Sequence, residues 1–292
     1  MYELIQAGEN SFYIQSPAKI GLVRQNETDV CLIDSGSDAS AGRKVRQLLD
    51  ARKWRLTAIY NTHSHADHIG GNHYLQAQTG CRVYAPGTEC AFTRYPLLEP
   101  GFLYGGFPPK ELRHKFLLAQ ESDARELTDA ALPEGLQSIP LPGHFFDMVG
   151  FRTADGVVYL ADCLSSEQTL EKYQIPFLCD VGAYLQTLET VASMQAELFV
   201  PAHAEAVPEI APLARRNIAR VNEVAERITA LCAQPLCFEE ILQKLFAQYA
   251  LEMDFAQYVL VGSTVRSYLA WLADTQKLRF AFDAGRMLWE RC

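Results

Sequence analysis

The feature that most constrains this chain is the run Thr-His-Ser-His-Ala-Asp-His at residues 62–68. Imidazole and carboxylate groups suit borderline metal ions such as zinc, and three histidines and one aspartate stand here within six positions. The apolar run at residues 56–61 precedes the cluster, and Gly70 and Gly71 follow it, which predicts a buried strand and then a loop. Side chains on a loop can converge on one ion, whereas a regular helix or strand would scatter them over several faces.

Three later residues have the same setting. His144, Asp162 and His203 each follow a strand-like run. Taken singly, each has an ordinary explanation as a loop histidine or a helix cap. If the strands are neighbours in two packed sheets, their ends bring these side chains and the earlier cluster to one edge. The pattern therefore predicts a two-metal hydrolytic site.

The motif H-x-H-x-D-H, followed in order by P-G-H, A-D-C-L and P-A-H, resembles the metallo-β-lactamase superfamily over roughly residues 10–206. This resemblance implies an α+β fold, the αββα sandwich. Asp34 matches a family aspartate that orients the ligand loop without binding metal. The resemblance also implies one metal held by three histidines, a second held by a further triad, and a bridging aspartate: His63, His65 and His144; Asp67, His68 and His203; and Asp162.

The ligand set favours two zinc ions, with iron or manganese as alternatives. Related flavodiiron oxidoreductases carry a glutamate where His65 stands, and persulfide dioxygenases lack the full second site. Two ions sharing a water lower its pKa from 15.7 towards about 7 and polarise the substrate oxygen. We therefore expect hydrolysis by a metal-bridging hydroxide, with Asp67 and Asp162 as catalytic ligands. Cys163 is interpreted as a small residue at a strand end and not as a nucleophile.

Composition favours a cytoplasmic enzyme. The 292 residues are 49% hydrophobic, enough for a large domain and a smaller one. The first residues lack the charged and apolar regions of a secretory signal, and no apolar run is long enough for a membrane span. Eight cysteines without a C-x-x-C pair suit reduced thiols. Since antibiotic-degrading lactamases of the superfamily are exported, we expect a metabolic small-molecule substrate instead.

The pattern changes near Pro208, which predicts a catalytic domain at residues 1–206 and a second domain at 207–292. Apolar residues in the second domain follow helical spacing, one helix is expected to start near Ser263, and an alternating run ends the chain in a hairpin. Helices followed by a hairpin resemble a winged helix. Such a domain occurs in a branch of the superfamily that includes a single-stranded RNA endonuclease, so a metal-dependent phosphodiesterase or RNA endonuclease is the alternative function.

Charge weighs against that alternative. After residue 206 the chain carries ten basic and ten acidic residues, and the whole chain has a net charge of −9. Nucleic-acid binding depends on neutralising phosphates with a basic face. We therefore expect no nucleic-acid partner, and interpret the second domain as packing within the chain or forming a homodimer.

The substrate is the least constrained part of the prediction. The metal site resembles that of glyoxalase II, although no basic cluster matches the glutathione-binding residues of that enzyme. We expect a small ester, thioester or lactone. Lys172 and Tyr173, after the bridging aspartate, are candidates for substrate contact, with surface solvation as the alternative. The last alternative is a non-catalytic metal-binding protein with a regulatory winged helix. It ranks last because loss of catalysis would normally accompany loss of a ligand, and no ligand position is missing.

Overall fold

The computed structural model describes residues 2–292, and packing divides the chain into two compact units. The N-terminal unit comprises Met1–Pro142, Phe146–Leu164 and Met194–Ile210. The C-terminal unit comprises Gly143–Phe145, Ser165–Ser193 and Ala211–Cys292. Two stretches before residue 206 thus group with the C-terminal helices. The division at residues 206 and 207 stays our proposal for the domains of the chain.

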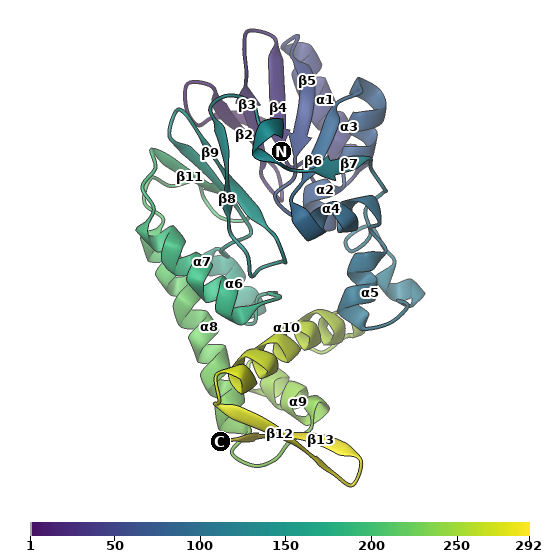
Figure 1. Ribbon diagram of the computed structural model, residues 1–292, viewed down its shortest axis with the longest axis vertical. Helices are drawn as coiled ribbons and strands as arrows, with labels where there is room; N and C mark the ends of the chain where they lie inside the picture. The colour runs from purple at the N-terminus through teal and green to yellow at the C-terminus, as the bar shows by residue number, and fades with distance from the viewer. Residues whose placement is uncertain (1) are drawn as a thin grey trace. The chain divides into compact units, whose positions relative to one another are not determined.

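The larger sheet of the N-terminal unit has seven strands in the order β1-β2-β3-β4-β5-β6-β7 (Figure 1). The first four strands pair antiparallel, whereas β4 to β7 pair parallel. Strands β3 and β4 are apolar and almost wholly buried, which is typical of strands covered on both faces. The strands span Glu3–Gln6 (β1), Ser11–Gln15 (β2), Ile20–Arg24 (β3), Asp29–Ile33 (β4), Arg55–Tyr60 (β5), Arg82–Ala85 (β6) and Ala124–Glu126 (β7).

The second sheet of this unit has four strands in the order β11-β10-β9-β8, with β10 and β11 parallel. The two sheets share a core in which Cys31 and Tyr60 of the larger sheet pack with Phe151 and Tyr159 of the smaller one. The Tyr159 hydroxyl also donates to the carbonyl of Phe12 over 2.7 Å. The four strands are Leu136–Pro140 (β8), Val149–Thr153 (β9), Val157–Ala161 (β10) and Leu198–Pro201 (β11).

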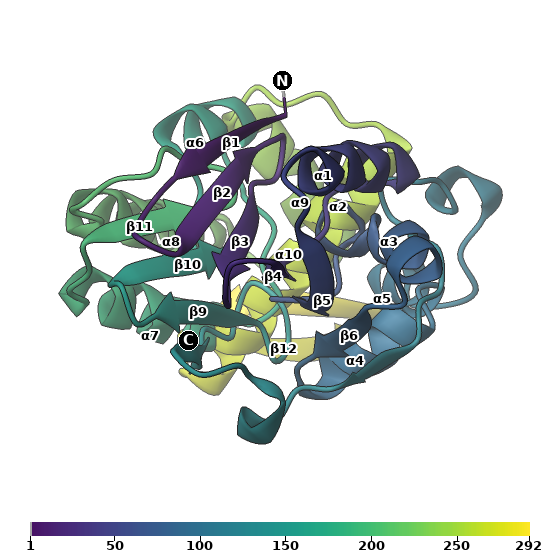
Figure 2. The ribbon, with the colours of Figure 1, turned by 90° about the horizontal axis from the view of Figure 1, so that it is seen from above.

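Helices cover the outer face of the larger sheet (Figure 2). Val45 and Leu49 of α1 and Leu75 of α3 join a buried cluster with Ile59 and Val83 of the strands. This arrangement confirms the sandwich expected from the sequence. The helices of this unit are Ala39–Ala51 (α1), Ala66–Ile69 (α2), Asn72–Thr79 (α3), Gly87–Arg94 (α4) and Leu98–Tyr104 (α5), with 3-10 turns at Lys110–Leu112 and Asp129–Ala131.

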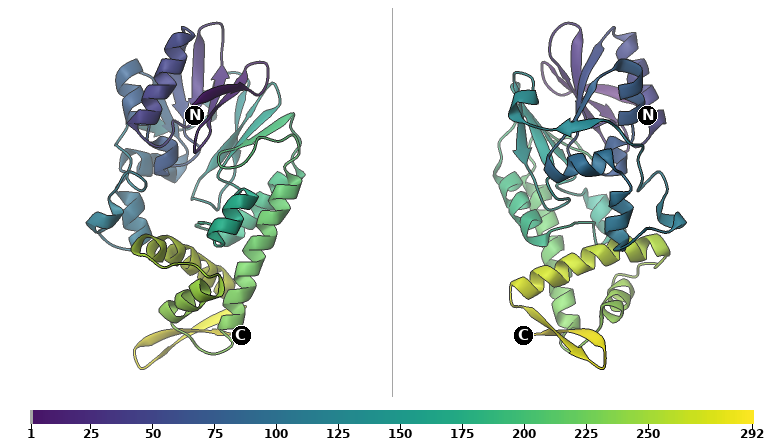
Figure 3. Two further views of the ribbon diagram at one scale, coloured as in Figure 1. Left: turned by 180° about the vertical axis from the view of Figure 1, so that it is seen from behind. Right: turned by 45° about the vertical axis from the view of Figure 1, so that its right-hand side comes forward.

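The C-terminal unit is helical and ends in a two-stranded hairpin, seen in yellow in Figure 3. Most of the apolar positions predicted for its core are buried, among them Val224, Leu245 and Leu269, whereas Phe238 is half-buried. The elements are Glu167–Tyr173 (α6), Val181–Ser193 (α7), Ala211–Leu231 (α8), Phe238–Gln248 (α9), Phe255–Asp274 (α10), Leu278–Asp283 (β12) and Arg286–Arg291 (β13).

One expectation for this unit was wrong. Helix α10 starts at Phe255 and not near Ser263, because Asp254 caps it by accepting a hydrogen bond from the backbone N–H of Gln257. The expected hairpin is present, and its alternating apolar residues differ in exposure: Leu278 is buried, whereas Phe280 and Phe282 are exposed.

Candidate metal centre

The Thr-His-Ser-His-Ala-Asp-His run leaves the larger sheet directly after β5. His63 and His65 lie on the loop, and the short helix α2 then presents Asp67 and His68. His63 and His68 are fully buried. At the end of α2, a Cβ atom on Gly71 would come within 2.3 Å of the Ser35 carbonyl oxygen, so the close approach of these two loops requires glycine there.

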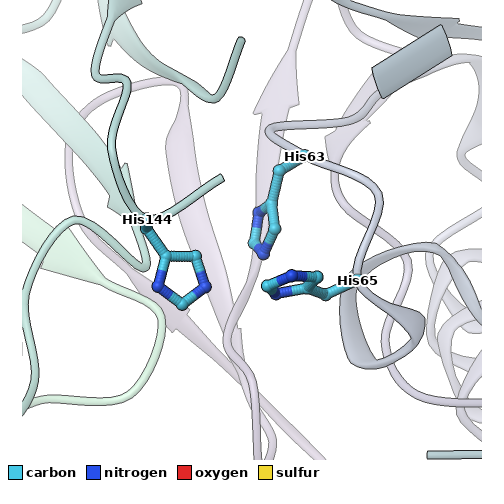
Figure 4. Close-up of side chains that lie close together, drawn as sticks. All are labelled: His63, His65 and His144. Carbon is cyan, nitrogen blue, oxygen red and sulfur yellow. The ribbon is translucent and has the colours of Figure 1, made fainter. Parts of the chain in front are cut away.

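The predicted ligands gather into three groups that could each hold a metal ion, with all ligand atoms of a group within 4.8 Å of one another. Figure 4 shows the first group, with the imidazoles of its three histidines turned toward one another. The groups are His63, His65 and His144; His63, His68 and Asp162; and Asp67, His68 and His203.

Asp162 belongs to the second group and also contacts His203 of the third. Its carboxylate oxygens lie 3.1 Å from Nε2 of His68 and 3.3 Å from Nε2 of His203. Asp67 lies 3.2 Å from the same atom of His203. Ala161, just before Asp162, has a left-handed φ of 50°, and the pairing of β10 with β11 shifts register at this point. This strained backbone places the aspartate just after the carboxyl end of β10.

Asp34, immediately after β4, organises the ligand loop. It accepts hydrogen bonds from the backbone N–H of Thr62 over 2.8 Å and from the Thr62 hydroxyl over 2.7 Å. Its carboxylate also lies 2.7 Å from Nδ1 of His68. This is the contact expected of a residue that orients a ligand without binding the metal.

Other histidines are oriented in the same way through Nδ1. This atom lies 3.0 Å from the Thr62 hydroxyl in His63, 3.2 Å from the Phe177 carbonyl in His144, and 3.0 Å from the Pro17 carbonyl in His203. A hydrogen bond at Nδ1 fixes the ring and directs Nε2 toward a metal. Gly143 makes the turn into His144 with a φ of +115°, where a Cβ atom would come within 2.2 Å of the Tyr184 backbone nitrogen.

The carboxylates make this centre favourable for positive charge. Asp162 raises the pKa of His203 to about 10, against the opposing effect of burial. Burial also opposes the charge on His68, yet Asp162 and Asp67 hold its pKa well above the usual range. Burial would raise the pKa of Asp67, but the adjacent His68 lowers it to about 2. A site that stabilises cationic imidazoles so strongly also suits metal cations.

Two buried carboxylates beside the ligand loop were missed by the sequence analysis. Glu89 of α4 accepts hydrogen bonds from the backbone N–H and hydroxyl of Ser64, over 3.0 and 2.6 Å, and from the Asp147 N–H over 3.1 Å. Burial raises its pKa to about 7. Glu99 of α5 lies 3.9 Å from Nε2 of His65, and burial raises its pKa well above the usual range. No motif marks either glutamate in the sequence.

The candidates for substrate contact lie at the end of α6 in the C-terminal unit. Tyr173 is 45% exposed, and the Lys172 ammonium lies 4.7 Å from the centre of its ring. Their role in substrate binding stays a prediction. Cys163 is fully buried, and burial raises the pKa of its thiol, which fits its interpretation as an unreactive strand-end residue.

The family model of the metallo-beta-lactamase superfamily matches residues 15–203. The chain belongs to this superfamily, which confirms the resemblance found in the sequence.

Curated relatives match over a short segment. A hydroxyacylglutathione hydrolase from Methylococcus capsulatus is 52% identical over 46 residues, which cover 16% of this chain and 18% of the relative. One from Rhodospirillum rubrum is 39% identical over 64 residues, 22% of this chain and 24% of the relative. The aligned part thus spans about a fifth of the length of these relatives.

Solved structures share the fold along the full chain. A beta-lactamase domain protein from Burkholderia ambifaria superposes with a TM-score of 0.77 and 17% identity, covering 99% of this chain and 94% of that one. A metallo-beta-lactamase family protein from Thermus thermophilus gives 0.71 and 16%, covering 100% and 98%. The comparison therefore extends the shared fold to the C-terminal helices. Among the described residues, no helix combines the length and apolarity needed to cross a membrane.

Proposed function

We propose that this protein is a metal-dependent hydrolase of small thioesters, esters or lactones, working with two divalent ions and zinc as the metal. The observation that carries the proposal is the arrangement of the ligand groups. In each of two triads, the possible ligand atoms lie within 4.8 Å of one another. A third group, which contains Asp162, shares one histidine with each triad.

In this proposal His63, His65 and His144 would hold the first ion, and Asp67, His68 and His203 would hold the second. Asp162 would serve as a ligand shared by both ions. The donor set fits borderline divalent metals, because it combines imidazoles with carboxylates and several of the imidazoles are oriented through Nδ1. When bound, two such ions would supply hydroxide at neutral pH and a Lewis acid for the substrate carbonyl.

The protein's own residues set the geometry for that chemistry. Asp34 fixes the ring of His68 and the backbone at Thr62 at the same time. Asp67 and Asp162 are the proposed catalytic carboxylates, because each comes from a different element and lies within 3.3 Å of Nε2 of His203. Lys172 and Tyr173 are proposed to contact the substrate, because an ammonium and a hydroxyl are groups that can donate to a developing oxyanion.

A thioester is our first choice of substrate. The curated relatives that match part of the chain are hydroxyacylglutathione hydrolases. Because the match is local, the assays have to vary both the acyl group and the thiol carrier of the thioester. We further propose that the enzyme works in the cytoplasm on a small molecule. The eight cysteines, all within the described residues, are thiols, which suits a reducing compartment.

The test combines metal analysis with paired assays on the same purified samples. We expect about two zinc ions per chain and chelator-sensitive hydrolysis of a chromogenic thioester or ester panel. His114→Gln, which changes an exposed histidine outside the ligand set, serves as the matched control and should keep both metal and activity. Selective cleavage of a bis-phosphodiester would favour a nuclease instead, and absence of bound metal would contradict the proposal.

A further inference from the structure

One face of the C-terminal hairpin is apolar and exposed. Phe280 lies opposite Trp289, and Phe282 lies opposite Met287, so the four side chains share a face. Phe280, Phe282 and Met287 are 54%, 73% and 36% exposed. The rings of Phe280 and Trp289 meet at 5.5 Å in a T-shaped contact. Single exposed apolar residues are normal, but a contiguous group marks an interaction surface.

The two edges of the hairpin differ. On the outer side of β13, Trp289 and Leu236 exchange two backbone hydrogen bonds of 2.8 and 3.0 Å. The backbone N–H and C=O of Trp289 therefore point away from β12. This makes Phe280 and Trp289 a non-hydrogen-bonded pair of the antiparallel ladder. It follows that the N–H and C=O of Phe280, and of Phe282 two residues further on, point away from β13.

That outer edge of β12 is open to pairing. Within residues 2–292, the only strand paired with β12 is β13. A strand edge with outward N–H and C=O groups is a template for another strand. Arg279 and Asp283 lie near the two ends of β12, separated by Phe280, Ala281 and Phe282.

The sequence of β12, Leu-Arg-Phe-Ala-Phe-Asp, is complementary to itself in one antiparallel register. With a two-fold axis at Ala281, the outward backbone groups of Phe280 meet those of Phe282 in a second copy. The side chains of these two phenylalanines then pack together. In the same register Arg279 lies opposite Asp283 of the second copy, twice, and the small Ala281 faces itself.

We propose that β12 is the homodimer interface of this protein, with a second copy of the chain paired antiparallel across Ala281. This contact is isologous and closes after two copies. Opposite charges at the two ends of the strand and apolar side chains between them favour a second copy of β12 over a partner of one charge sign. The proposal is independent of the metal centre.

Sedimentation of the full-length protein over a range of concentrations tests this dimer. We expect a monomer–dimer equilibrium for the unchanged chain. Arg279→Asp and Asp283→Arg each place like charges opposite one another in both ion pairs, so each variant should dimerise about tenfold more weakly. An equimolar mixture of the two variants restores opposite charges at both positions and should recover the dimer as a heterodimer.

Arg291→Asp is the matched control, because it makes the same charge change as Arg279→Asp on the exposed surface of β13, one strand away from the proposed interface. It should leave the equilibrium unchanged. The mixture also separates lost pairing from any local effect of removing the 2.9 Å Arg279–Glu290 ion pair. A monomeric unchanged chain, a dimer insensitive to both reversals, no recovery in the mixture, or equal weakening by Arg291→Asp would each overturn the proposal.

Discussion

The ligand loop at residues 62–68 and the hairpin β12–β13 depart from the usual burial rule in opposite directions. The loop buries polar groups: His63 and His68 are 0% exposed. The hairpin exposes apolar groups, with Phe282 at 73%. Buried polar groups and exposed apolar patches are the informative exceptions to the hydrophobic pattern. Inside the loop, Asp34 and Glu89 offset the cost of burial, whereas the exposed apolar face of the hairpin lies beside the strand edge that we propose to pair with a second copy.

The largest expected effect tests the ligand loop. Asp162→Ala removes the carboxylate shared between His68 and His203, so we expect kcat/KM to fall by about 10³-fold or more, equivalent to about 4 kcal/mol. Steady-state kinetics and metal content of the same sample check this. The exposed carboxylate variant Asp129→Ala is the control. Full activity with full metal content would rule out the bridging role.

The next largest effect is expected on the free energy of unfolding, from substitutions near the two ends of β12. Leu278 is 2% exposed, so Leu278→Ala should lower the free energy of unfolding by about 3 kcal/mol. Phe282→Ser on the same strand should change it by less than about 0.5 kcal/mol, because the side chain is exposed in the single chain. Denaturant unfolding of dilute, monomeric protein measures both. A large loss in the Phe282 variant would mean that this face already packs within the chain.

A smaller effect is expected from Asp34→Asn. The amide keeps an oxygen for the Thr62 N–H but loses the negative charge beside His68. Comparable changes next to metal ligands weaken metal binding by about 10–100-fold. Competition with a zinc chelator gives the affinity of the protein for each of the two ions. We expect the affinity to fall for the ion assigned to His68. Equal loss at both ions would place Asp34 in a general structural role.

The smallest effect is expected from Glu89→Gln. One carboxylate oxygen accepts both hydrogen bonds from Ser64, and the other accepts from Asp147, so an amide with one oxygen leaves at least one donor unsatisfied. We expect a loss of about 1–2 kcal/mol in unfolding free energy. The exposed Glu121→Gln is the control in a thermal or denaturant assay. An unchanged stability would show that the glutamate does not fix the ligand loop.

Much of the candidate site could be predicted because its signal is local. His63, His65, Asp67 and His68 stand within six positions after an apolar strand, and the residue type alone identifies possible ligands. Asp34 was predicted through the family pattern, and its hydrogen bonds to Thr62 and contact with His68 are those of an orienting residue. By contrast, Glu89 and Glu99 contact the loop from helices distant in sequence, and helical glutamates are too common to carry a signal.

The sequence was sufficient to predict the fold, because its ligand motifs and the strand-like runs before them carry the resemblance to the superfamily, and that resemblance implies the sandwich. It also determined the helical positions of the C-terminal core, since 3.6-residue periodicity follows from backbone geometry.

The tertiary structure was needed to show that Nδ1 is the hydrogen-bonded nitrogen in four of the candidate ligand histidines, which glutamates contact the loop, and which alternating residues of the hairpin are exposed. The physical reason is the same for all three. Periodicity defines the faces of an element, but the contacts that cover a face come from segments far away in the chain.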